Sequence, residues 1–415
     1  MVSTSSIEQV WKPDLLTKLY VFSMCLLVYN FADVLWLQSI PKAPLFILTN
    51  AIALLKVAKT NINYSPKKVF WIIVWFIYQM LPIMTRTSSP SSLGVHLLYV
   101  LIMSSVIFLS IDEMKYLLKA LTFCFVVILV ISIPPWLLYL MGVPLPHTGP
   151  HYHSNGYHIY YDYFFFRADA KIHSTDYNRF SSVFLEPGQM ATPCMFLFHL
   201  NTRKGKLFQF KNIVMLIGVL LSYSLISYGL LIVSLIVNQM SRSKNKVLLT
   251  VMTVLIIGGL SFYFSTHENN AINALIVSRL EYDEDNGISG YNRTTEDFDI
   301  RFDRLLESSD RYFGIHEEVT GEKYNWTTNA SGYKKFIVHN GIVGLALVLI
   351  LMGILWWDNS NFRALAFVTM VIVAFFVRDL LTSLLWLSIT VIGMYILGKE
   401  KETINSNPNI NSISS

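Results

Sequence analysis

The chain has 415 residues, of which 53% are hydrophobic and only 14% are charged. Soluble globular domains carry about 25% charged residues, so this composition excludes an ordinary soluble protein. The net charge of +5 is small and sits mostly in short connections between apolar segments, which indicates a membrane topology signal and excludes a nucleic-acid-binding surface.

The first thirteen residues are polar and show no apolar stretch with a small-residue cleavage site, so we expect no cleaved signal peptide. Apolar segments that we interpret as spans follow along the chain, and many of them reach the length that a bilayer crossing needs. They lie at about 19–37, 44–58, 69–85, 93–111, 117–141, 187–200, 247–264, 334–356, 363–378 and 380–398. The stretch 210–240 is long for one crossing, and we interpret it as two short crossings that turn near 224–229.

Charge placement favours that interpretation, because basic residues mark cytoplasmic connections. The lysines and arginines between the spans all fall on one side only if 210–240 crosses twice; a single crossing would place the loop SRSKNK outside. The sequence therefore predicts an all-α polytopic membrane protein with about 12 transmembrane helices, in a range of about 10–13, and with both termini in the cytoplasm. Two long outer loops are expected, the second partly helical.

The expected domains follow from these spans, and no internal repeat of fixed period is visible, which weakens the case for a transporter built from repeats. The three cysteines, Cys25, Cys124 and Cys194, lie in apolar segments, so no disulfide framework is expected. The domains are 1–141, an N-terminal bundle of roughly five spans; 142–185, the first outer loop; 186–264, the central spans; 265–333, the second outer loop; 334–398, the C-terminal spans; and 399–415, a disordered cytoplasmic tail.

The first outer loop is rich in histidine and tyrosine. His147, His151 and His153 are the candidates for metal ligands. No carboxylate or cysteine completes a ligand set with convincing spacing, so we expect no metal and interpret the loop as an aromatic segment at the membrane interface.

The stretch RFSSVFLEPGQMA places charges at the edge of an apolar segment. Pro187 suits the first position of a helix, which makes Glu186 the cap residue and directs the helix N-terminus towards the outer surface. Such an N-terminus favours anions. Arg179 beside it predicts a phosphate or diphosphate clamp; the alternative is an Arg179–Glu186 pair that anchors the span.

The second outer loop carries several arginines and the acidic run EYDED, whose spacing does not match an EF-hand. The segment DFDIRFDRLLES has the apolar spacing of an amphipathic helix, with Phe298, Phe302, Leu305 and Leu306 on one face. This helix brings Arg301 and Arg304 within one turn of each other. The alternative is a surface helix with internal ion pairs to Asp299 and Asp303.

Polar residues also interrupt the late apolar segments. His339 and Asn340 lie inside one, and Arg378-Asp379 divides another at an expected outer hairpin turn. Ionisable residues at such positions are functional candidates; a satisfied interfacial histidine and an Arg–Asp pair that caps the hairpin are the structural alternatives.

Taken together, these features resemble the O-antigen polymerase and ligase family, whose pattern is an arginine, a small residue, an aromatic residue and then Glu-Pro at the start of a span. The chain matches it at Arg179, Ser182, Phe184, Glu186 and Pro187. The Ser-rich LLSYSLISYGLL resembles the broken span that follows in the family. The resemblance runs in order from about the third span to the end of the chain.

Two later phrases extend the resemblance. RYFGIHEEV, from Arg311, resembles a loop motif of the family, and NASGYKKFIVHNGIVGL, with Asn329 and Tyr333, resembles its exit from the outer loop. Family members often carry His-Asn just before the Ser-x-Tyr phrase, where this chain has Thr328-Asn329. Since ligases tend to depend on that histidine and His339 lies further on, the resemblance favours a polymerase.

The resemblance implies a polysaccharide polymerase in the bacterial cytoplasmic membrane. It would transfer a growing O-antigen, capsule or exopolysaccharide chain from undecaprenyl diphosphate to the next lipid-linked repeat unit on the outer face, without a metal or cofactor. Its partners would be these lipid-linked donor and acceptor glycans, the bilayer and a chain-length regulator. The implied site consists of Arg179 and Arg301 as diphosphate ligands, with Arg293 and Arg304 beside them, Glu186 or His339 as the base, and Arg378, Asn329 and Tyr333 as further candidates.

Other functions stay open from sequence. A ligase would use the same donor with another acceptor. A flippase for lipid-linked oligosaccharides would need basic residues along a path inside the spans, whereas here the charge collects in the outer loops. A membrane acyltransferase would need a buried intramembrane histidine in a different context.

Overall fold

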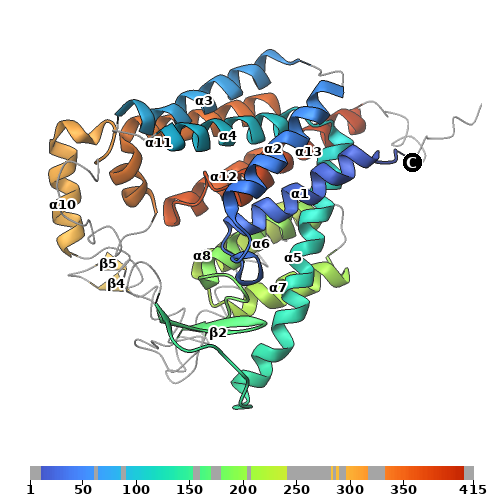
Figure 1. The fold of residues 1–415 in the computed structure, drawn as a ribbon, viewed down its shortest axis with the longest axis vertical. Coiled ribbons are helices and arrows are strands. Elements are labelled where there is room, and N and C mark those ends of the chain that lie inside the picture. Colours follow the sequence, from blue (N-terminus) through green and yellow to red (C-terminus); the bar gives the residue numbers. More distant parts are fainter. Residues whose placement is uncertain are drawn as a thin grey trace, which may run out of the picture.

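The structure, a computed structural model, describes residues 11–59, 64–85, 90–152, 159–169, 179–202, 207–240, 282–283, 287–288, 296–315 and 332–405. Helices dominate these residues, and small strands lie in the two long loops (Figure 1). The helices are α1 (Leu15–Phe31), α2 (Lys42–Lys59), α3 (Pro66–Thr85), α4 (Pro90–Ile107), α5 (Ile111–Leu140), α6 (Pro187–Thr202), α7 (Phe210–Leu221), α8 (Leu225–Met240), α10 (Glu296–Glu307), α11 (Tyr333–Asp358), α12 (Phe362–Val377) and α13 (Leu384–Asn405). The strands are β1 (His151–Tyr152), β2 (Ile159–Tyr163), β3 (Phe166–Asp169), β4 (Tyr282–Asp283) and β5 (Gly287–Ile288).

Apolar helices make this a protein suited to a membrane. In the described part of the chain, four helices are long and apolar enough to cross a bilayer, namely α3, α4, α5 and α11. Helices α1, α7, α8, α12 and α13 are apolar but shorter. The total of about 12 crossings therefore stays a prediction, and the expected span at 247–264 lies outside the described residues.

The lysine-rich connections gather at one end of the helical bundle. Lys56 at the end of α2 pairs with Glu113 at the start of α5, and Lys67 Nζ at the start of α3 donates to the Trp357 carbonyl at the end of α11, 3.3 Å away. We call this the basic end. It agrees with the predicted grouping of these connections on one side.

The opposite end, which we call the loop end, carries the outer-loop segments. There the Leu35 amide donates to the Val183 carbonyl over 3.0 Å, and Arg378 pairs with Glu186. Figure 1 shows the β1–β3 sheet below the bundle and α10 beside one end of α11. Segments far apart in sequence thus meet at the loop end.

The ambiguous stretch 210–240 is a helical hairpin. Lys211 Nζ at the start of α7 donates to Asn201 Oδ1 over 2.5 Å, and Asn238 Nδ2 near the end of α8 donates to Thr202 Oγ1 over 2.8 Å. Both ends of the hairpin therefore lie at the same end of α6, and the chain reverses between Leu221 and Leu225. The predicted reversal is confirmed, and its turn lies slightly earlier than 224–229.

Three boundaries differ from prediction. Helix α1 ends at Phe31 and not at 37, because Asp33 has a φ of 54° and the chain then forms a short 3-10 helix, Leu35–Leu37. The last segment is helical from Leu384 to Asn405, whereas we expected a span at 380–398 and disorder after it.

The first outer loop contains a sheet that the all-α prediction missed. β2 pairs antiparallel with both β1 and β3. Arg167 in β3 is 1% exposed; its Nε donates to Asp162 Oδ1 over 2.8 Å and its Nη2 to Gln38 Oε1 over 2.8 Å. This arginine ties the sheet to the α1–α2 connection. Tyrosine and phenylalanine favour strands, and most of the segment IYYDYFFF consists of these two residue types.

The second outer loop contains the predicted amphipathic helix. Phe298, Phe302 and Leu305 of α10 are buried and form one cluster with Ile337 and Val338 of α11. The apolar face inferred from sequence thus packs on the first turns of α11.

Helix α11 is broken at the same place. Gly341 has φ 66° and ψ 179°, and the Val343 amide donates to the Tyr312 carbonyl over 3.1 Å instead of to its own helix. The Ile315 amide likewise donates to the Val338 carbonyl over 2.8 Å. The RYFGI segment is therefore inserted against the break in α11.

We expect Gly341→Ala to destabilise the protein by about 1–3 kcal/mol, because only glycine adopts this backbone conformation readily. A Cβ atom there would also lie 2.1 Å from the Tyr312 carbonyl oxygen. Thermal unfolding in detergent measures the effect. Gly353→Ala is the matched control in the same helix, since no atom lies within 4 Å of its added Cβ; equal stability of the two variants would contradict the account of the break.

Candidate functional site

The start of α6 lies at the centre of the loop end. Pro187 is its first residue, as predicted, because proline lacks the amide hydrogen that a first helical turn leaves unused. The Glu186 carbonyl accepts from the Gln189 and Met190 amides at 3.1 and 3.2 Å. The helix therefore presents its N-terminus at this end of the bundle, where the dipole favours an anion.

Arg378 covers this helix start. It is the last residue before the α12–α13 turn, and its Nη1 lies 2.5 Å from Glu186 Oε2. Its guanidinium lies so close to Gly188 that a Cβ added there would be 2.2 Å from Nη2 and 2.3 Å from Nε. The Glu186 carboxylate therefore holds the guanidinium at the N-terminus of α6, and the missing side chain of Gly188 leaves room for it there.

The Arg378 Nε atom is buried and has no hydrogen-bond partner among the residues that the structure describes. A buried donor without a partner carries a desolvation cost of about 1–3 kcal/mol. An anion at this position would remove that cost. The expected Arg378–Asp379 hairpin turn is confirmed, but Glu186, 192 positions away, forms the ion pair with Arg378.

Asp379, the next residue, carries a partly buried carboxyl group. Burial raises its pKa, and the Glu186 charge raises it further, whereas Lys335, its own backbone hydrogen bond and Arg378 oppose the rise. A carboxylate whose pKa is raised is a stronger base than an exposed aspartate. This makes Asp379 a candidate proton acceptor at the loop end.

A cavity of about 340 Å³ opens beside Asp379. Asn340 from the break in α11 lines it, together with Gln79 of α3 and His96 of α4, whose Nδ1 lies 2.8 Å from Gln79 Oε1. Thr382 and Ser383 add hydroxyl groups. Tyr78, Tyr99, Pro82 and Leu380 complete the lining. The volume, with polar groups beside aromatic rings, suits a small ligand such as one or two sugar rings.

Arg179 lies at the hairpin turn and contacts backbone carbonyls. Its Nε donates to the Ser222 carbonyl over 3.3 Å and its Nη2 to the Tyr223 carbonyl over 3.0 Å, while the Phe180 amide donates to the Leu221 carbonyl over 3.1 Å. The Arg179 side chain therefore fixes the α7–α8 turn. Glu186, the residue that the sequence paired with Arg179 as an alternative, forms an ion pair with Arg378.

Arg301 and Arg304 of the second loop lie on the exposed face of α10. Arg301 Nε pairs with an Asp297 carboxylate oxygen at 3.1 Å, and both Arg301 and Arg304 are exposed on α10. Asp299 instead pairs with Lys334, at 2.6 Å. The structure records no contact of Arg301 or Arg304 with Glu186 in its described residues, and Arg293 lies outside them.

The remaining candidates occupy the start of α11. The Tyr333 ring packs on Phe376 with centroids 5.3 Å apart. His339 lies just before the break, with its backbone against Gly314. Tyr333 thus packs against α12, and His339 lies next to Asn340 of the cavity; Asn329 lies outside the described residues.

His147 of the first loop forms aromatic contacts. The His147 ring lies 4.8 Å from Tyr161 and 5.1 Å from Tyr163, centroid to centroid. No group of three metal-ligating side chains occurs among the described residues. His153 and the His151 side chain are not among them.

The sequence named Asp379 with Arg378 as a functional candidate but gave no signal for Lys335, whose charge acts on Asp379. The only sequence signal for Asp379 is its position beside Arg378 inside an apolar run. Comparison with protein-family models, with curated proteins and with solved structures finds no match to this chain.

Proposed function

We propose that this chain is a membrane polysaccharide polymerase that transfers a growing glycan from a polyprenyl diphosphate carrier to a lipid-linked repeat unit at its loop end. The observation that carries the proposal is the position of the Arg378 guanidinium at the start of α6. It pairs with Glu186 and lies against Gly188, and its buried Nε atom has no hydrogen-bond partner among the described residues. The ordered motif resemblance supports the same reaction class.

The reaction needs a cation at the leaving group. The acceptor hydroxyl oxygen forms a bond to the anomeric carbon of the donor sugar, and the bond from that carbon to the diphosphate oxygen breaks. Negative charge develops on the departing diphosphate. Arg378 and the α6 N-terminus are preorganised to receive it, and such donors stabilise transition states far more than they do in water.

The reaction also needs a base for the acceptor proton. Asp379 lies beside Arg378 and lines the 340 Å³ cavity, whose polar groups would hold the acceptor sugar. Glu186 would then position Arg378 and not take the proton. The proton leaves the hydroxyl for the Asp379 carboxylate as the new glycosidic bond forms, so no metal is required by this scheme.

Arg179 has a supporting role in this proposal. By holding the carbonyls of the α7–α8 turn it fixes the segment that leads into α6. Arg301 and Arg304 on the exposed face of α10 would attract the anionic donor towards the site.

The test uses a polymer-producing bacterial host from which this protein has been deleted. Lipid-linked glycans are separated by size, and their leaflet is assigned by glycosidase or lectin access in spheroplasts. We expect a ladder with the wild-type chain and single repeat units on the outer face without it. Accumulation of single units on the inner face would identify a flippase and overturn the proposal.

A further inference from the structure

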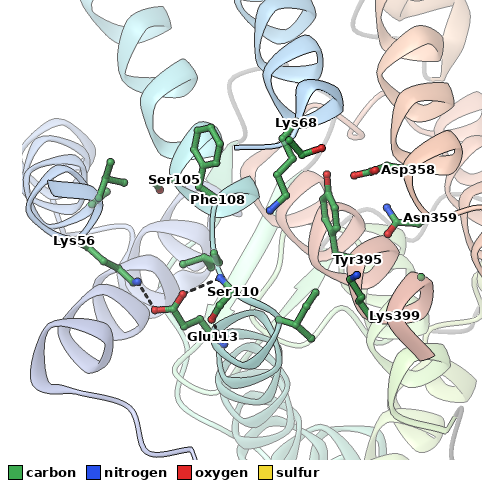
Figure 2. A pocket seen from close by; sticks show the side chains of 16 residues that line it. Lys56, Lys68, Ser105, Phe108, Ser110, Glu113, Asp358, Asn359, Tyr395 and Lys399 are labelled. Carbon is green, nitrogen blue, oxygen red and sulfur yellow. Dashed lines mark hydrogen bonds and ion pairs between the residues drawn. The ribbon is translucent and has the colours of Figure 1, made fainter. Parts of the chain in front are cut away.

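A second and larger cavity lies at the basic end, remote in the fold from the site described above. Its volume is about 630 Å³, and the ends of α2, α3, α4, α5, α11 and α13 meet around it (Figure 2). This volume falls in the range of sites for small ligands, about 300–1,000 Å³. The wall is built from side chains of six helices, so its shape depends on the whole bundle.

The charge of the wall favours an anion. Lys56, Lys68 and Lys399 line the cavity, against the two carboxylates of Glu113 and Asp358.

Glu113 pairs with Lys56 and accepts the Ser110 amide at 2.8 Å, and Asp358 lies 3.6 Å from Lys67 Nζ. Positive charge is therefore in excess over the described wall.

Lys68 is placed to meet a ligand. Its ammonium lies over the Tyr395 ring, 5.0 Å from the centroid, and Figure 2 shows the side chain reaching into the space between the helices, with Lys399 below Tyr395. The tyrosine ring holds the lysine from one side by a cation–π contact. Lysine ammonium groups in this arrangement bind phosphate as point charges.

The outer surface beside the cavity is apolar. Leu54 and Leu55 on α2 are 51% and 57% exposed, and Val69 and Phe70 on α3 are 38% and 47% exposed. They adjoin Lys56 and Lys68 in sequence, and α3 is among the helices able to cross a bilayer. A lipid could thus place its phosphate in the cavity and its acyl chains on this surface.

We propose that the basic-end cavity binds the phosphate of an anionic lipid headgroup from the leaflet that faces the basic end. The bound lipid would tie α3, α11 and α13 together there. Basic pockets between membrane helices recognise such headgroups through their lysines. The proposal is independent of the glycan-transfer site and stands whether or not that site is a polymerase.

The test compares the purified full-length chain in nanodiscs of phosphatidylcholine with and without phosphatidylglycerol. Lipid retention is measured by native mass spectrometry and stability by thermal unfolding. We expect phosphatidylglycerol to be retained and to raise the melting temperature of the wild-type chain. The double variant Lys68→Gln/Lys399→Gln should bind it at least about tenfold more weakly, since each of these lysines would lose a charge-assisted hydrogen bond to the phosphate in the cavity.

Matched variants separate the cavity from general charge. Lys59→Gln/Lys115→Gln removes the same charge from exposed positions at the same end and should bind as the wild-type chain does. Lys68→Arg/Lys399→Arg retains the charge and should retain most of the lipid. Equal loss of binding in the exposed pair and the cavity pair would overturn the proposal. Equal stabilisation by glycerol phosphate in discs without phosphatidylglycerol would overturn the assignment to a lipid.

Discussion

Arg378→Ala should reduce polymer formation by about 10²–10³-fold while the protein still reaches the membrane. Removal of one preorganised donor from a developing oxyanion costs about 2.7–4 kcal/mol, and Arg378 is the described cation nearest the start of α6. The measurement is the initial rate of elongation of lipid-linked glycan in membranes with matched protein levels. Single repeat units should accumulate on the outer face.

Three further variants make this result specific. Arg378→Lys keeps the charge but loses the planar fork, so it should recover only part of the rate. Gly188→Ala leaves Arg378 in the chain but places a Cβ where the guanidinium lies, so it should lower the rate without removing any charged group. Lys42→Gln breaks the exposed pair with Asp33 at the same end and should leave the rate unchanged.

An unchanged elongation rate in Arg378→Ala would show that this arginine only fastens α12 to α6. A rate lost equally in Lys42→Gln would indicate a general effect of charge at the loop end. Either result would move the diphosphate site to another part of the chain, and Arg179 would be the next residue to replace.

The sequence predicted much of the helical framework, because long apolar segments and lysine placement are local signals. The hairpin within 210–240 could be inferred since both of its ends are basic, and α10 could be inferred from the spacing of Phe298, Phe302 and Leu305. Pro187 marked the start of α6 through its own chemistry. These features depend on residues close together in the chain.

The site could be predicted only in part, because its decisive contacts join distant residues. Glu186 and Arg378 were both candidates, yet their pairing across 192 positions has no local signal. Arg179 stood closer in sequence to Glu186 but contacts the α7–α8 turn. The early end of α1 at Phe31 also has no local sequence signal. The segment that follows it is held by a distant residue, since the Leu35 amide donates to the Val183 carbonyl.

Asp379→Asn should lower the elongation rate by about 10²-fold, because the variant keeps the shape of the side chain but cannot accept the proton. For the wild-type chain, burial raises the pKa of Asp379. Its activity should therefore fall with decreasing pH at a higher pH than an exposed aspartate would give. The pH dependence of the elongation rate in wild-type membranes and in Asp379→Glu membranes measures this, and the glutamate should retain an acid limb that the asparagine lacks.

The stability of the Asp379→Asn variant should not fall with its elongation rate. A carboxyl group whose pKa is raised on folding destabilises the folded state above that raised pKa, and the penalty disappears below the pKa of the unfolded chain. Asp379→Asn removes the penalty, so its melting temperature at neutral pH should equal or exceed that of the wild-type chain, with the difference shrinking as the pH falls. If the variant instead loses activity and stability together at neutral pH, Asp379 holds the α12–α13 turn and the base must be sought at Glu186 or His339. A variant that is stable but inactive would support Asp379 as the base. The wild-type chain keeps a carboxylate there although it lowers the stability of the folded state, and this indicates a functional role.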